Sequence, residues 1–112
     1  MPKFMLMLFD HPADYAGLSP DQMQGVVQEY NAWCQEMAKA GKFLGGEKLA
    51  DEGGKVITQS GVTDGPFAES KEVLGGYFTI LADSYEEAVE LASSSPHVKY
   101  GASTHVRQID AH

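Results

Sequence analysis

The first hydrophobic segment of the chain runs without interruption over residues 4–9. Its short length and the Asp10-His11-Pro12 sequence behind it favour a β-strand over a buried helix. A second strongly apolar segment, residues 73–82, predicts another strand. In both segments the two sets of alternating side chains are hydrophobic, so we expect both faces of these strands to be covered.

A long amphipathic helix is predicted between these strands, from Pro20 to the residues before Gly41. Ser19 suits the N-cap, Pro20 suits the first helical position, and Gln22 completes a capping box. Gly41 stands where a left-handed C-cap residue is expected. The apolar residues recur at steps of three and four and form one stripe, which consists of Met23, Val26, Val27, Tyr30, Cys34 and Met37.

The remaining segments predict a second helix and further strands. Ser84 and Glu87 form another capping box, and the helix behind it ends before Pro96. Residues 43–49 predict a strand with a bulge at Gly45-Gly46, and residues 104–109 predict the last strand. A short strand at residues 56–58 is expected to form a hairpin with the 43–49 strand across a turn at residues 51–54. The segment after it, which contains Asp64-Gly65-Pro66, is expected to be a loop.

This element order predicts a single α+β domain over residues 1–112. The order β-α-β, hairpin insertion, β-α-β predicts a ferredoxin-like βαββαβ fold with both helices on one face of the sheet and strands 4–9 and 73–82 at its centre. The other face would then expose a large apolar surface. A homodimer that packs sheet on sheet would cover it. The alternative is that the inserted hairpin folds over this face.

Composition narrows the classes of partner. The chain has 112 residues, a formal net charge of −8 and a pI near 4.8. Such a surface repels phosphate backbones and anionic lipid, so we expect neither nucleic acid nor membrane as a partner. The single cysteine, Cys34, cannot form an intramolecular disulfide and is interpreted as a buried thiol. No export signal is visible, which favours a cytoplasmic location.

The residues that could carry chemistry form no recognisable metal or cofactor motif. His11 follows the first strand, a common place for site residues. His97 and His105 lack metal-ligand spacing, so we expect no metal and no cofactor. Asp64-Gly65-Pro66 has the chemistry of a turn. The alternative is a stiff loop that holds Asp64 and Glu69 at the mouth of a pocket, as acids, bases or cation ligands.

Several passages together resemble the YCII-related family in its DGPF-domain branch. They are residues 3–9, 30–31, 40–47, 62–72, 75–78, 100–101 and 106–109, of which Thr63-Asp64-Gly65-Pro66-Phe67-Ala68-Glu69 is the most specific. The resemblance implies a ferredoxin-like subunit that pairs into a dimeric α/β barrel, with a pocket in each subunit. Members of this branch are often associated with extracytoplasmic-function sigma factors, which suggests a regulatory role.

Some relatives are proposed enzymes because of a histidine in the first helix and an aspartate before a proline after the last helix. The resemblance places Tyr30 and Ser95 at these positions, so both halves of that pair are missing here. A tyrosine–serine pair holds its protons too tightly for imidazole–carboxylate chemistry at neutral pH. Catalysis would need another set, and the candidates are His11, Asp64 and Glu69 as catalytic residues, with Tyr30, Glu47 and Tyr77 binding the ligand.

Three functions remain open from the sequence. The favoured one is a dimeric module of unestablished activity that binds a small molecule or has a regulatory role. The alternative is an enzyme that performs lyase- or isomerase-type proton transfer on a small polar or aromatic compound, in which case His11 or Asp64 should line a pocket near Tyr30. A purely structural dimer would have no pocket.

Overall fold

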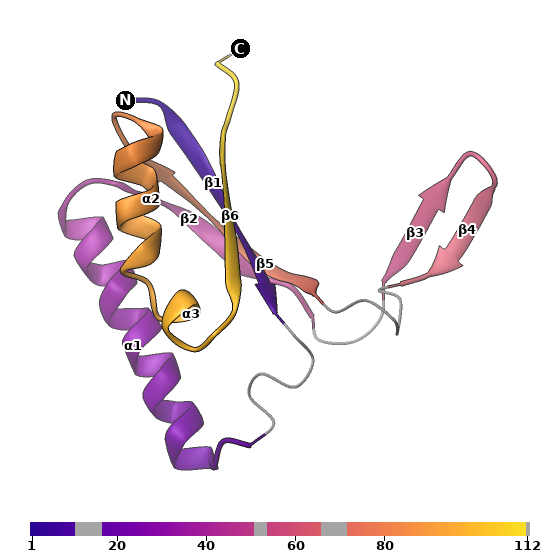
Figure 1. Cartoon of the computed structure of the whole chain (residues 1–112), viewed down its shortest axis with the longest axis horizontal. Coiled ribbons are helices and arrows are strands. Elements are labelled where there is room, and N and C mark those ends of the chain that lie inside the picture. The colour runs from indigo at the N-terminus through magenta and orange to yellow at the C-terminus, as the bar shows by residue number, and fades with distance from the viewer. Residues whose placement is uncertain (11–16, 51–53, 66–71, 112) are drawn as a thin grey trace.

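The computed structural model of the chain describes residues 1–10, 17–50, 54–65 and 72–111. It is a mixed α+β structure built on a four-stranded antiparallel sheet with strand order β2-β5-β1-β6, and a separate two-stranded hairpin, β3-β4 (Figure 1). The strands are β1 (Lys3–Asp10), β2 (Phe43–Lys48), β3 (Lys55–Thr58), β4 (Gly61–Asp64), β5 (Val73–Leu81) and β6 (Ser103–Gln108). The two most apolar strands, β1 and β5, are central as predicted, and this order is compatible with a ferredoxin-like arrangement.

The helices cover one face of the sheet (Figure 1). They are α1 (Pro20–Lys39), α2 (Tyr85–Ser93) and the single turn α3 (Pro96–Lys99). The core lies between them and the sheet, where β1 contributes Phe4 and Leu6, β5 contributes Ile80, and α1 contributes Trp33 and Met37. Burial of these large side chains is the main force that holds the helices to the sheet.

The helix starts follow from local sequence. The Ser19 hydroxyl accepts a hydrogen bond from Gln22 N at 3.1 Å, and the Gln22 side chain accepts one from Ser19 N at 2.8 Å, so the predicted capping box of α1 is confirmed. Gly41 ends this helix with φ of 72°, a left-handed conformation that favours glycine. Ser84 caps α2 by accepting from Glu87 N at 3.2 Å. The Glu87 carboxylate instead accepts from Asp83 N and pairs with Lys42.

The predicted hairpin partner was wrong. The strand at residues 56–58 belongs to β3, which pairs with β4 rather than with β2. The turn between them is the dipeptide Gln59-Ser60, followed by Gly61 with φ of 137°. Thr63 and Asp64 therefore end a strand and do not lie in a loop, while residues 66–71 are outside the described residues. The helix α3 was not predicted at all.

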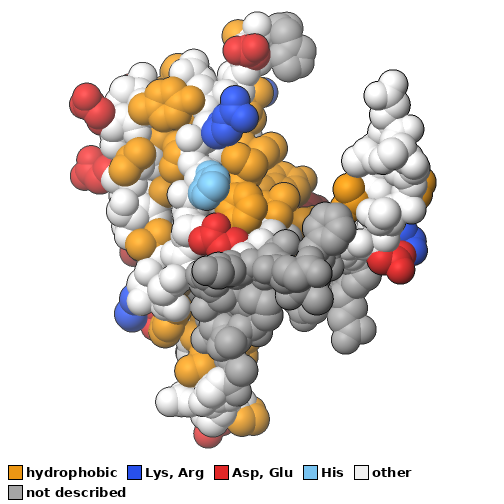
Figure 2. Space-filling model, turned by 45° about the vertical axis from the view of Figure 1, so that its right-hand side comes forward, with side chains coloured by type: hydrophobic (Ala, Val, Ile, Leu, Met, Phe, Trp, Pro, Cys, Tyr) orange, Lys and Arg blue, Asp and Glu red, His pale blue; other side chains and the backbone are white. Residues whose placement is uncertain are grey.

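No helix of the described residues lies on the second face of the sheet (Figure 1). Its apolar side chains include the half-buried Met5, Met7 and Phe9 of β1 and Tyr77 of β5, which alternate with the core residues. Figure 2 shows hydrophobic side chains gathered on this side of the molecule, and the β3-β4 hairpin stands apart from them. In the described part of the chain, no helix is long and apolar enough to cross a membrane.

Candidate functional site

A cavity of about 400 Å³ lies between α1 and the sheet, at the end where β1 meets α3. Most of its wall is apolar. The side of α1 that faces it carries Met23, Val26, Val27, Tyr30, Asn31 and Cys34. Opposite α1 lie Leu8 and Asp10 of β1, Gly46 and Lys48 of β2, Gly76 and Phe78 of β5, and His97 of α3. An apolar space with a few converging polar groups is the usual form of a small-molecule site.

His97 is the most deeply buried polar side chain of this cavity, with 2% of its surface exposed. Its Nε2 lies 3.1 Å from the carbonyl oxygen of Phe9 and 3.1 Å from that of Ser103, the last residue pair of the β1–β6 ladder. Carbonyl oxygens only accept hydrogen bonds, so Nε2 carries a hydrogen and donates it. In the neutral ring the other nitrogen, Nδ1, is therefore a free base with a lone pair.

That lone pair points to Tyr30. The Tyr30 hydroxyl lies 2.8 Å from His97 Nδ1, and because Nδ1 accepts in the neutral ring, the hydroxyl donates. Asp10 stands on the other side, with its Oδ1 3.6 Å from the same nitrogen. A carboxylate at this distance stabilises the imidazolium that forms when Nδ1 takes up a proton. The three side chains can thus accept a proton and hold it.

Local sequence explains why these groups meet. Tyr30 belongs to the apolar stripe of α1, which must face the sheet. Asp10 is the last residue of β1, and its side chain follows the alternation of Phe4, Leu6 and Leu8 toward the helices. Pro96 starts α3 immediately after its N-cap residue Ser95, and this places His97 in the first turn, buried against the end of the sheet.

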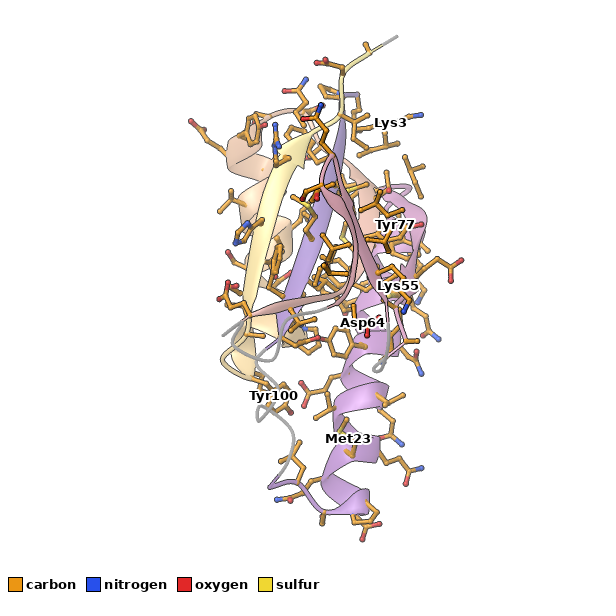
Figure 3. All side chains as sticks on the ribbon, turned by 90° about the vertical axis from the view of Figure 1, so that its right-hand side faces the viewer. Lys3, Met23, Lys55, Asp64, Tyr77 and Tyr100 are labelled. Atoms are coloured by element: carbon orange, nitrogen blue, oxygen red, sulfur yellow. The ribbon has the colours of Figure 1, made fainter. Side chains whose placement is uncertain are left out.

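The sequence-predicted residues are only partly brought together. Tyr30 lines the cavity. Glu47 belongs to the cavity wall, but its register opposite Tyr77 turns its side chain to the other face of the sheet. Tyr77 lies on that other face, the one toward the hairpin (Figure 3). The Asp64 side chain is 88% exposed and paired with Lys55 on the hairpin, as Figure 3 shows. His11 and Glu69 lie outside the described residues.

Sequence reasoning missed Asp10 and His97. The resemblance instead pointed to Ser95, which precedes Pro96 and occupies the position where some relatives have an aspartate. Ser95 is buried, and its hydroxyl has no hydrogen-bond partner within the described residues. The signal present in the sequence was His97 itself, a histidine directly after Pro96. Nothing local linked it to Tyr30, which is 67 residues away.

Two other polar groups shape the chemistry of the cavity. Lys48 belongs to the cavity wall, and its ammonium group donates a hydrogen bond to the carbonyl oxygen of Leu49 at 3.2 Å. Cys34 is half-buried, and this burial raises the pKa of its thiol, which makes it a poor nucleophile. Across the described ranges, no three His, Cys, Asp or Glu side chains converge as metal ligands.

Comparison with known proteins places the chain in a family. The model of the YCII-related domain matches residues 2–110. The chain belongs to the YCII-related family. The match does not distinguish the DGPF branch within the family, so that assignment stays a prediction. A search of curated proteins found no match.

Among solved structures, this YCII-related chain is similar to the 5-chloro-2-hydroxyhydroquinone dehydrochlorinase of Burkholderia phenoliruptrix, described in complex with 2,5-dihydroxybenzoquinone. The two share 15% sequence identity, with a TM-score of 0.60 over 96% of this chain and 93% of the other. At this identity the likeness shows a common fold and nothing of the reaction.

Proposed function

We propose that the cavity binds a small hydroxylated compound and that the Tyr30–His97–Asp10 group removes a proton from it. The observation that carries this proposal is the hydrogen bond between the Tyr30 hydroxyl and His97 Nδ1, because in the neutral ring the two carbonyl oxygens at Nε2 leave Nδ1 as the acceptor. A phenolic oxygen can accept a hydrogen bond while it donates its own hydrogen, so the Tyr30 hydroxyl can take a proton from a ligand as it passes its own to His97. Tyr30 therefore presents an acceptor backed by a base.

The proposed step is a relay of protons. A ligand hydroxyl donates its hydrogen to Tyr30 Oη, the Tyr30 hydrogen moves to His97 Nδ1, and the ligand is left as an oxyanion. Asp10 balances the new charge on the imidazole, and Lys48 offers a cation to the ligand. Returning the proton to another atom of the ligand would complete an isomerisation. If the oxyanion instead expels a leaving group together with its bonding electrons, the ligand loses that group and the proton, and the net reaction is an elimination.

The apolar wall sets the class of ligand. Leu8, Val26 and Phe78 suit a flat hydrophobic ring, and the relay suits an acidic hydroxyl upon it. A phenol or hydroquinone combines both features. The dihydroxybenzoquinone bound by the structural neighbour is a compound of this kind, which supports the class without identifying the substrate.

A nitrophenol tests the proposal, because its colour reports whether it is ionised. In buffer acidic enough to keep free 4-nitrophenol protonated, we expect the bound probe to show the phenolate band. Tyr30→Phe and His97→Gln should reduce the ionised fraction at least about tenfold, which corresponds to one pH unit. Tyr85→Phe is the matched control, since its hydroxyl accepts a hydrogen bond from Gln108 N outside the cavity.

The outcomes distinguish among the three functions that the sequence left open. A probe that binds but stays protonated in the wild type would overturn proton transfer and leave ligand binding, with or without a regulatory role, as the function. If no phenol raised the melting temperature in a thermal-shift screen, both phenol binding and proton transfer would be excluded, because a ligand that binds only the folded state must raise its stability.

We also propose that the protein is a homodimer through the second face of the sheet. The support is the row of half-buried Met5, Met7, Phe9 and Tyr77, which no helix of the described chain covers. A symmetric sheet-on-sheet contact would bury this row against itself. A dimeric α/β barrel is the assembly that the family resemblance implies.

A further inference from the structure

Gly75 has no side chain at a point where one would collide with the proposed site. A Cβ built on Gly75 would lie 2.1 Å from Asp10 Oδ2 and 3.3 Å from Asp10 Cγ. Both distances are shorter than ordinary van der Waals contact. The Asp10 carboxylate thus rests in the space that the missing methyl group leaves.

The position of Gly75 in the sheet accounts for this contact. Leu8 pairs with Gly76 and Phe9 pairs with Leu74, so Gly75 is the extra residue of a β-bulge in β5. Beyond the bulge, Asp10 pairs with Val73. A bulge re-aims side chains beside it, and here the side chain beside it is Asp10.

A side chain at position 75 is disfavoured by lack of space and not by the backbone conformation. The φ of Gly75 is not among the positive values that glycines adopt in this chain, so its backbone would accept an L-residue. Asp10 is the group that would give way, because its side chain is 34% exposed and can rotate toward solvent. An alanine at Gly75 should therefore fold and yet move the carboxylate.

From these contacts we infer that Gly75 is a positioning residue that holds the Asp10 carboxylate beside His97 Nδ1. The inference rests on the proposed function in one respect: Asp10 must matter for the ionisation of the ligand. The positioning itself is a separate claim about geometry. Gly75 acts through Asp10 and contacts no reacting atom.

Two measurements test the inference. First, a crystal structure of Gly75→Ala should show both Asp10 carboxylate oxygens more than about 4 Å from His97 Nδ1, beyond ion-pair distance. Second, Gly75→Ala should lower the ionised fraction of bound 4-nitrophenol about as much as Asp10→Asn does. In the Asp10→Asn background, the alanine should have no further effect, because the two changes act on one interaction.

Gly25→Ala is the control, since a Cβ at Gly25 has no neighbour within 4 Å. A carboxylate that stays within 4 Å of Nδ1 in Gly75→Ala would overturn the inference whatever the probe does. Additive losses in the double variant would also overturn it, because Gly75 would then act by another route. A wild-type protein that fails to ionise the probe contradicts the proposed function alone, and the crystallographic result still decides the role of Gly75.

Discussion

A buried imidazole costs stability unless both ring nitrogens find partners. His97 meets this demand with main-chain oxygens at Nε2 and with Tyr30 at Nδ1. The same contacts that satisfy the ring also fix its tautomer, so structural and chemical roles coincide in one residue. A stability measurement alone therefore cannot separate the structural role of His97 from its chemical role. The ionised fraction of bound 4-nitrophenol reports the chemical role.

The alkylation rate of Cys34 can report whether a ligand occupies the cavity. Its pKa is raised by burial, so little thiolate exists at neutral pH and we expect slow alkylation by iodoacetamide. Because Cys34 lines the cavity wall and is the single cysteine of the chain, a bound phenol should slow the reaction further. Mass spectrometry of the intact protein measures both rates. Alkylation at the rate of a free thiol, unaffected by the ligand, would contradict the location of the binding site.

The candidate site shows which residue roles a sequence can reveal. Tyr30 was predicted because the resemblance places it at the position of the relatives' histidine, and helical periodicity also puts it on the apolar stripe of α1. His97 and Asp10 were not, since a contact between β1 and α3 depends on how distant segments pack. Asp64 was a candidate as the carboxylate of a stiff loop at the mouth of a pocket, and in the structure it pairs with Lys55 on the hairpin.

At the scale of elements, a polar cluster of Glu29, Lys99 and Tyr100, called here the clasp, links α1 to α3. Glu29 accepts hydrogen bonds from the Tyr100 hydroxyl at 2.8 Å and from Lys99 Nζ at 3.2 Å. The Tyr100 hydroxyl and then the Lys99 ammonium hold the pKa of Glu29 below its ordinary value of 4.5. The Glu29 carboxylate in turn raises the pKa of Lys99 above 10.5.

The clasp gives stability a defined dependence on pH. A lowered pKa in the folded state means that Glu29 contributes stability above pH 4.5, and that this contribution is lost as the pH falls through the folded pKa. Lys99 stabilises the folded state below pH 10.5. This stabilisation is lost as the pH rises through the raised pKa that Lys99 has in the folded state. We expect Glu29→Gln to lower the urea midpoint at neutral pH and to match the wild type in strong acid. Glu36→Gln on the same helix is the control, and an equal loss at every pH would contradict the linkage.

The close approach of β2 and β5 depends on Gly46. A Cβ there would lie 2.3 Å from Tyr77 O and 2.5 Å from Phe78 Cδ1. The first of these atoms is backbone and cannot rotate away, so we expect Gly46→Ala to cost about 2 kcal/mol in the free energy of unfolding. Urea unfolding followed by circular dichroism measures it. Gly25→Ala is the control: at this open helical position, alanine should raise the free energy of unfolding by about 0.5–1 kcal/mol. A Gly46→Ala variant with an unchanged free energy of unfolding would contradict the close packing of β2 against β5.

Sequence predicted the elements better than their pairing. Capping residues and hydrophobic periodicity are local, and they placed α1, α2 and the central strands correctly. The hairpin partner was wrong because the glycine-rich residues 51–54 outweighed Gln59-Ser60 as a turn signal. The β4 strand, Gly61–Asp64, is exposed at every position, so it left no hydrophobic pattern to detect.

At the scale of the whole molecule, the proposed homodimer depends on the sheet face that no helix of the described residues covers. Met7 lies at the centre of this face, paired with Tyr77 on one side and His105 on the other. We expect Met7→Glu to convert the dimer to a monomer, because a carboxylate buried in an apolar interface loses its hydration without a partner. Light scattering coupled to size-exclusion chromatography measures the mass at several concentrations. Val89→Glu, at an exposed position of α2, adds the same charge to the helical face and should leave the dimer intact. A wild-type monomer at every concentration, or a Met7→Glu variant that remains a dimer, would show that a second copy does not cover this face.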